Sequence, residues 1–320
     1  MKDLPKDPSG RQKTNQTLEW TVLKLLKWSV SYFETHRVEN PRASAEILLS
    51  HVLNLKRIEL YVRYEQPVVS SELKRFKDVI KRRIEKEPVA YIVGHKGFWS
   101  MDFKVTPEVL IPRPETEHLV EAALTYSQRL SRLSKENAPE KEGKKRILEL
   151  GTGSGAIILS LASELQKHLF FASDISPGAI RVARINAGKH QLENRVSFFL
   201  GSWFSPLREK STAFNLIISN PPYIPTSEID RLQPETRKYE PRNALDGGAD
   251  GLDFIRHLIQ QAYIHLVEGG ALMLEIGHDQ KDSVETIAAG TGRYENVSFF
   301  KDLSGFDRVA CMIKKRLMAK

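Results

Sequence analysis

Residues 147–155 read Ile-Leu-Glu-Leu-Gly-Thr-Gly-Ser-Gly, an apolar run that ends in three glycines separated by single small residues. The apolar run is typical of a buried strand, and the apolar segment from Ala156 to Leu165 is typical of a helix. Glycines let the backbone pass close to a ligand, and the helix N-terminus behind them offers free N–H groups. The stretch therefore predicts a strand, a tight turn and a helix, the first unit of a parallel sheet.

Strands and helices continue to alternate after this loop, which favours a doubly covered α/β sheet. Helices are expected from Pro177, over 252–266 and over 279–289. The further strands are predicted at 169–173, 196–200, 214–219, 270–277, 297–301 and 308–313. This makes about seven strands, mostly parallel, with no helix between the last two. Residues 225–251 are long and polar, and a loop of this length is usually functional or disordered.

An acidic residue ends the second of these strands. Asp174 lies 19 residues after Gly155, a spacing that suits a carboxylate accepting hydrogen bonds from ribose hydroxyls. The glycine loop and this acid together favour an adenosine-containing cofactor over a coincidental turn. A dinucleotide fingerprint would need its third glycine at Ala156, and because that substitution is permitted in some dinucleotide enzymes, NAD stays open here.

A stiff turn follows the strand over 214–219. Residues 217–225 read Ile-Ile-Ser-Asn-Pro-Pro-Tyr-Ile-Pro, and the prolines end the strand because they cannot donate to a sheet ladder. The amide of Asn220 and the ring of Tyr223 are thus expected at the carboxyl end of a strand, where open α/β sheets bind ligands. Trp203, which follows the strand over 196–200, either covers a flat base or belongs to the core.

The N-terminal third has helical periodicity and no catalytic cluster. We predict a helix over 17–35 capped by Thr17, a second helix after Asn40-Pro41, a short segment over 57–65 and a helix capped by Ser70 or Ser71. Residues 89–105 suggest a β-hairpin. The expected organisation is an extension over 1–16, a helical substrate-docking bundle over 17–87, a hairpin connector over 88–112 and a catalytic domain over 113–320. Residues 131–145 are expected to form a mobile surface loop.

The net charge of +8 is concentrated in this N-terminal third, because residues 1–95 hold 18 Lys and Arg against 12 Asp and Glu, or +6. A solvated helix face and a docking surface for a large acidic partner both fit, and contact with RNA or the ribosome stays open. The single cysteine, Cys311, excludes a disulfide framework and a Cys-based zinc site. No apolar run or leader pattern indicates a membrane span or secretion signal, so we expect a cytoplasmic protein that needs no metal.

The motifs together resemble a family. The Glu-Leu-Gly-Thr-Gly-Ser-Gly loop, Asp174 and Asn-Pro-Pro-Tyr at 220–223 are similar to class I S-adenosylmethionine-dependent methyltransferases that act on a planar nitrogen. With Ile-Pro-Arg-Pro-Glu-Thr-Glu at 111–117 and Tyr-Glu-Pro-Arg-Asn-Ala-Leu at 239–245, the chain resembles the peptide chain release factor glutamine N5-methyltransferases, the PrmC/HemK family. The likeness extends from about Thr17 to Lys315.

The resemblance implies a Rossmann-like methyltransferase sheet and methyl transfer from S-adenosylmethionine, with S-adenosylhomocysteine as product, to the glutamine of a Gly-Gly-Gln motif in release factors. It implies that the methionine moiety is held by Gly151, Thr152, Gly153, Ser154 and Gly155, that Asp174 binds the ribose and that Trp203 lies beside the adenine. Asn220, Pro221, Pro222 and Tyr223 would hold the substrate glutamine, and Asn220 would also contact the cofactor. Asn220, Pro221 and Tyr223 are the expected catalytic residues.

Two departures stand out. Ser202 replaces an acidic residue that many relatives carry before Trp203, and Glu149 replaces the commoner Asp. The main alternative is an adenine-N6 methyltransferase acting on DNA or RNA, because a flipped adenine presents the same planar amino group. A non-catalytic binding module and a dinucleotide oxidoreductase are the others; the intact Asn220–Tyr223 motif argues against both. Nothing in the sequence demands an oligomer, and we expect a monomer.

Overall fold

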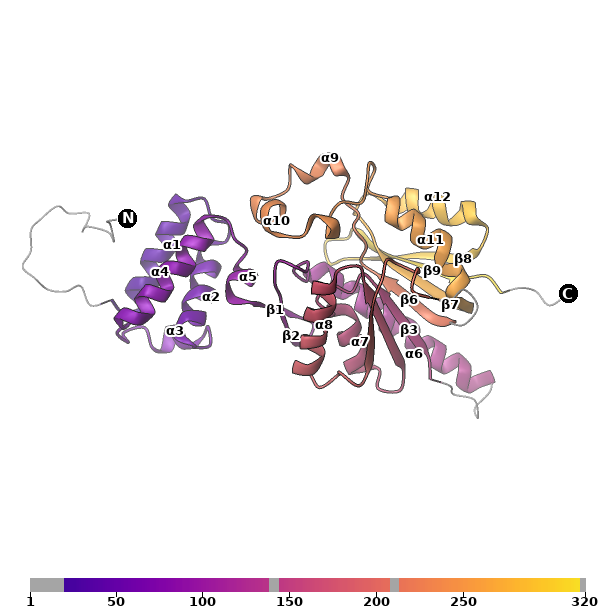
Figure 1. Cartoon of the computed structure of the whole chain (residues 1–320), viewed down its shortest axis with the longest axis horizontal. Helices are drawn as coiled ribbons and strands as arrows, with labels where there is room; N and C mark the ends of the chain where they lie inside the picture. Colours follow the sequence, from indigo (N-terminus) through magenta and orange to yellow (C-terminus); the bar gives the residue numbers. More distant parts are fainter. Residues whose placement is uncertain (1–19, 138–143, 208–212, 317–320) are drawn as a thin grey trace, which may run out of the picture. The chain divides into compact units, whose positions relative to one another are not determined.

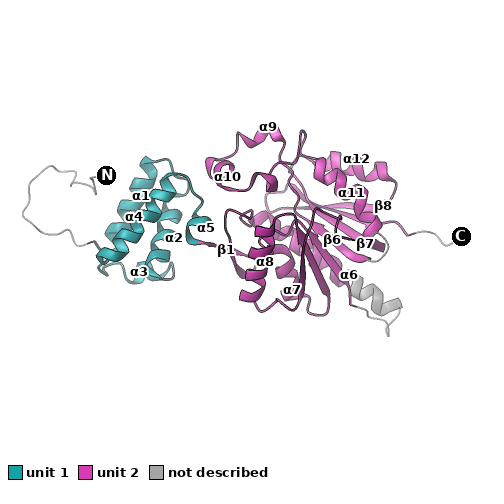
Figure 2. Ribbon diagram, in the orientation of Figure 1, with its two compact units in different colours: residues 1–93 teal, residues 94–320 magenta. Residues whose placement is uncertain are grey.

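The computed structural model describes residues 20–137, 144–207 and 213–316, and the chain divides into two compact units, Met1–Val93 and Gly94–Lys320 (Figure 2). The first unit is helical. The second contains a seven-stranded sheet with helices on both faces. Among the described residues, no helix combines the length and the apolar content that crossing a membrane requires.

The first unit is built from five helices among the described residues: α1 (Val22–Thr35), α2 (Pro41–Leu53), α3 (Glu59–Val62), α4 (Ser70–Ile84) and α5 (Val89–Val93) (Figure 1). Their apolar faces meet in one core that includes Phe33, Leu48 and Phe76. The helices of the predicted bundle are therefore confirmed, but the predicted N-caps of α1 and α4 are wrong. Thr17 lies outside the described residues, and the N-cap of α1 is Thr21, whose hydroxyl accepts from the Lys24 N–H.

The start of α4 also differs from the prediction, and its basic residues differ in exposure. Ser70 and Ser71 lie inside the helix, because the Glu72 carboxylate reaches back to accept from the Val69 N–H and satisfies the first turn. Lys74, Arg75, Lys77 and Lys81 are exposed, as a solvated or docking face requires. Arg83 is instead buried, where it donates to Ser44 and to the Glu87 carbonyl.

The predicted hairpin is shorter than residues 89–105. Residues 89–93 form α5, and only β1 (His95–Phe98) and β2 (Met101–Lys104) pair as an antiparallel hairpin. Residues 89–93 read Val-Ala-Tyr-Ile-Val, and an apolar run this short does not separate a helical turn from a strand. Pro88 favours a helix start at this point. Next come η1 (Pro114–Thr116) and α6 (Glu117–Asn137).

The sheet of the second unit has the order β5-β4-β3-β6-β7-β9-β8. Its strands are β3 (Arg146–Leu150), β4 (Leu169–Asp174), β5 (Val196–Leu200), β6 (Phe214–Ser219), β7 (Leu266–Glu275), β8 (Tyr294–Lys301) and β9 (Asp307–Lys314). The first five are parallel, and β9 pairs antiparallel with both β7 and β8. The predicted fold class is confirmed, including the final strand pair without a helix between its members.

Alternating side chains of the central strands fill two cores, one on each face of the sheet. Ile147 and Ile218 pack with α6 and with α7 (Ala156–Glu164) on one face. Leu148 and Ile217 pack with α11 (Asp253–His265) and α12 (Lys281–Thr291) on the other. Because both faces are covered, the central strands are mostly apolar, as is typical of buried parallel strands, and Glu149 of β3 is a buried exception. The remaining long helix, α8 (Pro177–Lys189), follows β4.

Two predicted loops contain helix. Residues 131–137 continue α6, because the segment holds good helix formers and no proline before position 139; residues 138–143 lie outside the described ranges. The segment 225–251 contains α9 (Thr226–Ile229), α10 (Pro234–Tyr239) and η2 (Arg242–Ala244). Prolines at the first position of α10 and before η2 set the start of each, so this segment is an ordered part of the unit.

Candidate functional site

The carboxyl ends of β3, β4, β5 and β6 meet at one edge of the sheet and enclose a cavity of about 270 Å³. From β3 the chain goes to β4 on one side, and β6 lies on the other, so this is the point where the strand order reverses. Open α/β sheets bind ligands at such points. The sequence-predicted residues that line the cavity are Gly151, Thr152, Gly153, Ser154, Asp174, Trp203, Asn220 and Pro222.

The glycine loop after β3 is held at its start and open at its centre. The N–H groups of Gly151 and Thr152 both donate to the Ser173 carbonyl at the end of β4, at 2.9 Å each. Gly153 has a φ of +55°, and a Cβ there would meet nothing within 4 Å. Gly155 does not line the cavity. A Cβ on Gly155 would lie 3.0 Å from the Leu159 side chain, so this glycine allows close packing.

Asp174 is connected to the glycine loop directly. One carboxylate oxygen accepts from the Gly153 N–H at 2.8 Å, and the other accepts from the Ser176 N–H at 2.9 Å. Burial raises the pKa of Asp174, and the backbone N–H groups oppose that rise by favouring the charged form. A carboxylate accepts about four hydrogen bonds, so oxygen lone pairs remain for hydroxyl groups in the cavity.

A second acid, Glu149, lies beneath the glycine loop. It is 1% exposed, and its Oε2 accepts from the Thr152 hydroxyl at 2.5 Å and from the Ile158 N–H at 3.2 Å. Burial raises the pKa of Glu149 to about 8. A cation in the cavity would favour its charged form.

Trp203 has a left-handed backbone with a φ of +48°, which is uncommon for a residue with a bulky side chain. Its ring is half-buried, 5.2 Å from the Phe254 ring between centroids, and it lines the cavity close to Gly151. Strain of this kind is found where surrounding structure fixes a side chain for function. The ring therefore forms a wall of the cavity rather than part of the core alone, and neighbouring Ser202 lines the cavity as well.

The turn after β6 presents unused hydrogen-bond acceptors. Asn220 is half-buried and donates through Nδ2 to the Thr116 hydroxyl oxygen at 3.2 Å. Among the described residues, none donates to Asn220 Oδ1 or to the Pro221 carbonyl. Pro221 is buried and does not line the cavity. Tyr223 does not line it either, since its hydroxyl turns away to donate to Glu275 at 3.2 Å.

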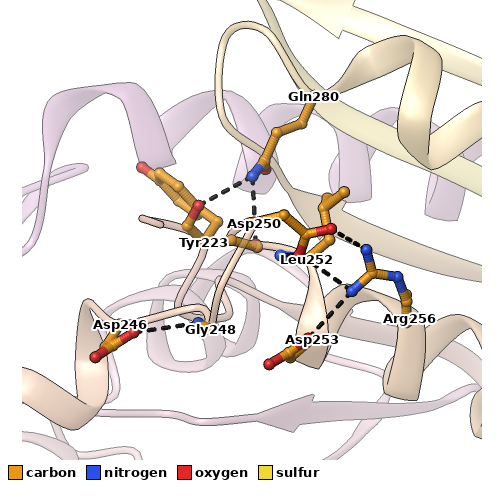
Figure 3. Close-up of polar contacts among 9 residues, drawn as sticks. Tyr223, Asp246, Gly248, Asp250, Leu252, Asp253, Arg256 and Gln280 are labelled. Carbon is orange, nitrogen blue, oxygen red and sulfur yellow. Dashed lines mark hydrogen bonds and ion pairs between the residues drawn. The ribbon is translucent and has the colours of Figure 1, made fainter. Parts of the chain in front are cut away.

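The segment 245–251 holds this turn in place (Figure 3). The Ile224 N–H donates to the Leu245 carbonyl at 3.0 Å, and the Ile224 carbonyl accepts from the Gly247 N–H at 2.8 Å. Gln280 donates through Nε2 to the Tyr223 carbonyl at 3.0 Å. Glycine is required at two positions: a Cβ on Gly247 would lie 2.8 Å from the Pro222 carbonyl, and one on Gly251 would lie 2.3 Å from that of Tyr223. On either side of Gly251, Asp250 and Asp253 both pair with Arg256 in the first turn of α11 (Figure 3).

A buried ion pair joins the remaining walls of the cavity. Glu240 is 6% exposed, accepts from Arg113 at 2.5 Å, and also accepts from the Ile111 N–H at 3.1 Å. The motifs at 111–117 and 239–245, more than a hundred residues apart, are therefore packed together. Sequence reasoning noted both motifs and missed that they interact. It also missed several lining residues, which are Glu108, Val109, Leu110, Ile175, Asn243 and Phe254.

The charge of the lining separates the possible ligands. The ionisable residues that line the cavity, among those described, are Glu108, Arg113, Glu149 and Asp174. Arg113, the one cation of this set, is paired with Glu240. A lining of this kind disfavours the pyrophosphate of a dinucleotide and suits a positively charged ligand that carries ribose hydroxyls. Within the described ranges, no group of three His, Cys, Asp or Glu side chains is arranged to hold a metal ion.

Parts of both units match known protein families. A family described as PrmC N-terminal domain matches residues 24–94, and one described as methyltransferase domain matches residues 141–240. The chain is 42% identical to the release factor glutamine methyltransferase of Geobacter sulfurreducens, over 91% of this chain and 95% of that one. It is 38% identical to the protein of the same name from Rhodopirellula baltica, over 94% and 99% of the two chains. Among solved structures, a methyltransferase from Pyrococcus furiosus is 19% identical, with a TM-score of 0.46, over 75% of this chain and 100% of that one.

Proposed function

The chain belongs to the release factor glutamine methyltransferases, and we propose that it transfers a methyl group from S-adenosylmethionine to the side-chain amide nitrogen (N5) of the glutamine in the Gly-Gly-Gln motif of translation release factors. The observation that carries the proposal is the pair of unused acceptors, Asn220 Oδ1 and the Pro221 carbonyl, at the edge of the sheet where the cavity opens. A primary amide has two N–H groups, and two acceptors match them.

The cavity fits S-adenosylmethionine, whose sulfonium supplies the methyl group. The open side of Gly153 leaves room for the methionine moiety beside the loop residues 151–155. Asp174 retains lone pairs for the ribose hydroxyls, and the Trp203 ring offers a flat wall for the adenine. The acidic lining supports a cationic cofactor over NAD. Gly155 contributes by allowing close helix packing rather than by touching the cofactor.

The substrate amide would be aimed by the turn after β6. An amide nitrogen is a poor nucleophile because its lone pair is delocalised, so orientation toward the methyl group is the main contribution the protein can make. Asn220 Oδ1 and the Pro221 carbonyl accept the two N–H bonds, and they stabilise the positive charge that grows on the nitrogen. Pro222 lines the cavity beside them. The half-buried Tyr223, which lies outside the cavity lining, would contact the planar amide only from the far side of the turn.

The first unit would dock the protein substrate. Support comes from the exposed basic residues of α4, which are Lys74, Arg75, Lys77 and Lys81. We also propose a cytoplasmic location and a monomer that uses no metal, because the proposed chemistry needs only the cofactor and residues of one chain.

Labelled methyl donor distinguishes this function from adenine-N6 methylation. The full-length protein is incubated with labelled S-adenosylmethionine and either a release factor or DNA and RNA of mixed sequence. The expected result is label in the release factor alone, and Asn220→Ala serves as the control for background transfer. Label in nucleic acid and none in the release factor would contradict the proposal.

A further inference from the structure

A buried polar group lies behind the Asn220 turn. Thr116, in η1, is 4% exposed, and Glu275, at the end of β7, is 2% exposed. Thr116 lines the cavity and Glu275 does not. Neither residue belongs to the glycine loop or to the turn, although both are in contact with side chains of that turn.

Two separate hydrogen bonds join the turn to these residues, one to Thr116 and one to Glu275. Asn220 donates through Nδ2 to Thr116 Oγ1 at 3.2 Å, and the Tyr223 hydroxyl donates to Glu275 Oε1 at 3.2 Å. The nearby Thr116 hydroxyl and the positive charge of Arg308 both favour the charged form of Glu275. Within the described residues, Glu275 Oε2 has no hydrogen-bond donor.

An incompletely paired carboxylate in the core costs stability, so folding alone does not explain Glu275. Its chemistry suggests a different role. While Glu275 is charged, its unpaired Oε2 can only accept. Rotation of the nearby Thr116 hydroxyl would supply that missing donor and keep the lone pairs of the Thr116 oxygen for other donors. Thr116 is then an acceptor for Asn220, and the amide of Asn220 must place its NH₂ group toward Thr116 and its oxygen toward the substrate.

We propose that Thr116 and Glu275 are positioning residues that fix the orientation of the Asn220 amide, an inference that rests on the proposed function. The reverse orientation would set the NH₂ group of Asn220 against the NH₂ group of the substrate glutamine, two donors without an acceptor. The clamp would then lose one of its two acceptors, and the substrate nitrogen would no longer be aimed.

Threonine variants test this directly in the full-length protein. Thr116→Val keeps the shape and removes the hydroxyl, Thr116→Ser restores it, and Ser160→Ala removes a buried hydroxyl of α7 that does not line the cavity. Thr116→Val is expected to lower kcat for release factor methylation about tenfold or more, the effect of a lost hydrogen bond. For Thr116→Val, the KM for the release factor and the Kd for S-adenosylhomocysteine should stay within about twofold of the wild-type values. The kcat values of Thr116→Ser and Ser160→Ala should stay within about threefold of the wild-type kcat.

Glu275→Gln provides a second measurement, because a positioning role and a structural role predict opposite changes in the Tm of this variant. Replacing a buried carboxylate by an amide removes the cost of burying charge, so Tm should be unchanged or higher. The amide can donate to Thr116, so kcat should still fall about tenfold. A lower Tm together with weaker S-adenosylhomocysteine binding in both variants would assign a structural role and overturn the inference.

The pH dependence of kcat adds a third readout. Burial raises the pKa of Glu275 to about 7, in surroundings that include Thr116 and Glu115 of η1, Tyr223 after β6 and Arg308 of β9. At saturating cofactor, the wild-type kcat should rise as pH passes through about 7, and Glu275→Gln should not show this rise. If the kcat of Thr116→Val stays within twofold of the wild-type value, the inference is overturned. If the wild type does not methylate the release factor at all, the proposed function is overturned and this inference with it.

Discussion

In the proposed function Asn220 presents a neutral oxygen to the substrate, and its neutrality matters as much as its shape. Aspartate has nearly the same size but would be held by burial and by the Thr116 contact as a poorly solvated acid. In its charged form the aspartate would bind the substrate amide too rigidly. In its protonated form the carboxyl group would donate a hydrogen bond in place of accepting one. Positioning by a neutral acceptor accounts for the proposed role without a general base.

Asn220→Asp is therefore expected to lower kcat for release factor methylation by at least about 100-fold, the size of effect typical when a group that stabilises developing charge is replaced. The Kd for S-adenosylhomocysteine should change by no more than a few-fold. Single-turnover methylation and calorimetry measure the two quantities. Near-normal turnover in the variant would show that Asn220 does not aim the substrate.

Glu149 makes the stability of the protein depend on pH. Its pKa of about 8 in the folded protein lies above the ordinary value of 4.5. For a group whose folded pKa is raised, the favourable contribution is fully present below about 4.5 and is lost as pH rises through about 8. Glu275, with a pKa raised to about 7, adds to the same trend.

Glu149→Gln should remove most of this dependence in the cofactor-free protein. At pH 5 the variant and the wild type should unfold at similar temperatures. At pH 8.5 the variant should be more stable by on the order of 2 kcal/mol, because the wild type must then bury a charge. Thermal unfolding measured across this range checks the prediction, and an identical pH dependence in both proteins would contradict it.

At the scale of elements, the turn after β6 depends on the segment 245–251 packed against it. Gly251 has a φ of +75°, and a Cβ would lie 2.3 Å from the Tyr223 carbonyl oxygen. The position therefore requires glycine for two reasons, backbone conformation and close approach. Gly292, after α12, has a φ of +64° with nothing within 4 Å of the Cβ position, so it shares only the first reason.

Gly251→Ala and Gly292→Ala form a matched pair for this reason. Both should lose about 1 kcal/mol of stability from the left-handed backbone. Gly251→Ala should lose more and should reduce methyl transfer about tenfold or more, because the turn must shift. Thermal unfolding and initial rates distinguish the two, and equal behaviour of both variants would show that close packing at Gly251 is unimportant.

The elements themselves were largely predictable from the sequence. The seven strands and the long helices follow from apolar periodicity, and the cavity lies where the glycine loop, Asp174 and Asn220 were expected to meet. The contacts that support the turn were not predictable. Thr116, Glu240 and Glu275 are brought to the site by packing between distant segments, and neither periodicity nor a local motif indicates such pairings. The N-cap of α1 and the helix over residues 89–93 were missed because local patterns of that length are ambiguous.

At the scale of the whole molecule, the two units divide the work we propose. The second unit carries the cavity and the turn, and the first carries the exposed basic face of α4.

If that face docks the protein substrate, the double variant Lys74→Glu with Lys77→Glu should raise the KM for the release factor several-fold, with kcat and cofactor affinity unchanged. Steady-state kinetics at two salt concentrations measure this. If the double variant has the wild-type KM at low salt, the basic face of α4 is only a solvent-exposed surface and does not dock the substrate.

The most direct measurement is mass spectrometry of the Gly-Gly-Gln peptide from a release factor, before and after incubation with the protein and S-adenosylmethionine. One added methyl group on the glutamine side chain is expected with the wild type, and Asn220→Asp should give almost none in the same time. An unmodified glutamine, or a methyl group on any other residue, would contradict the central claim.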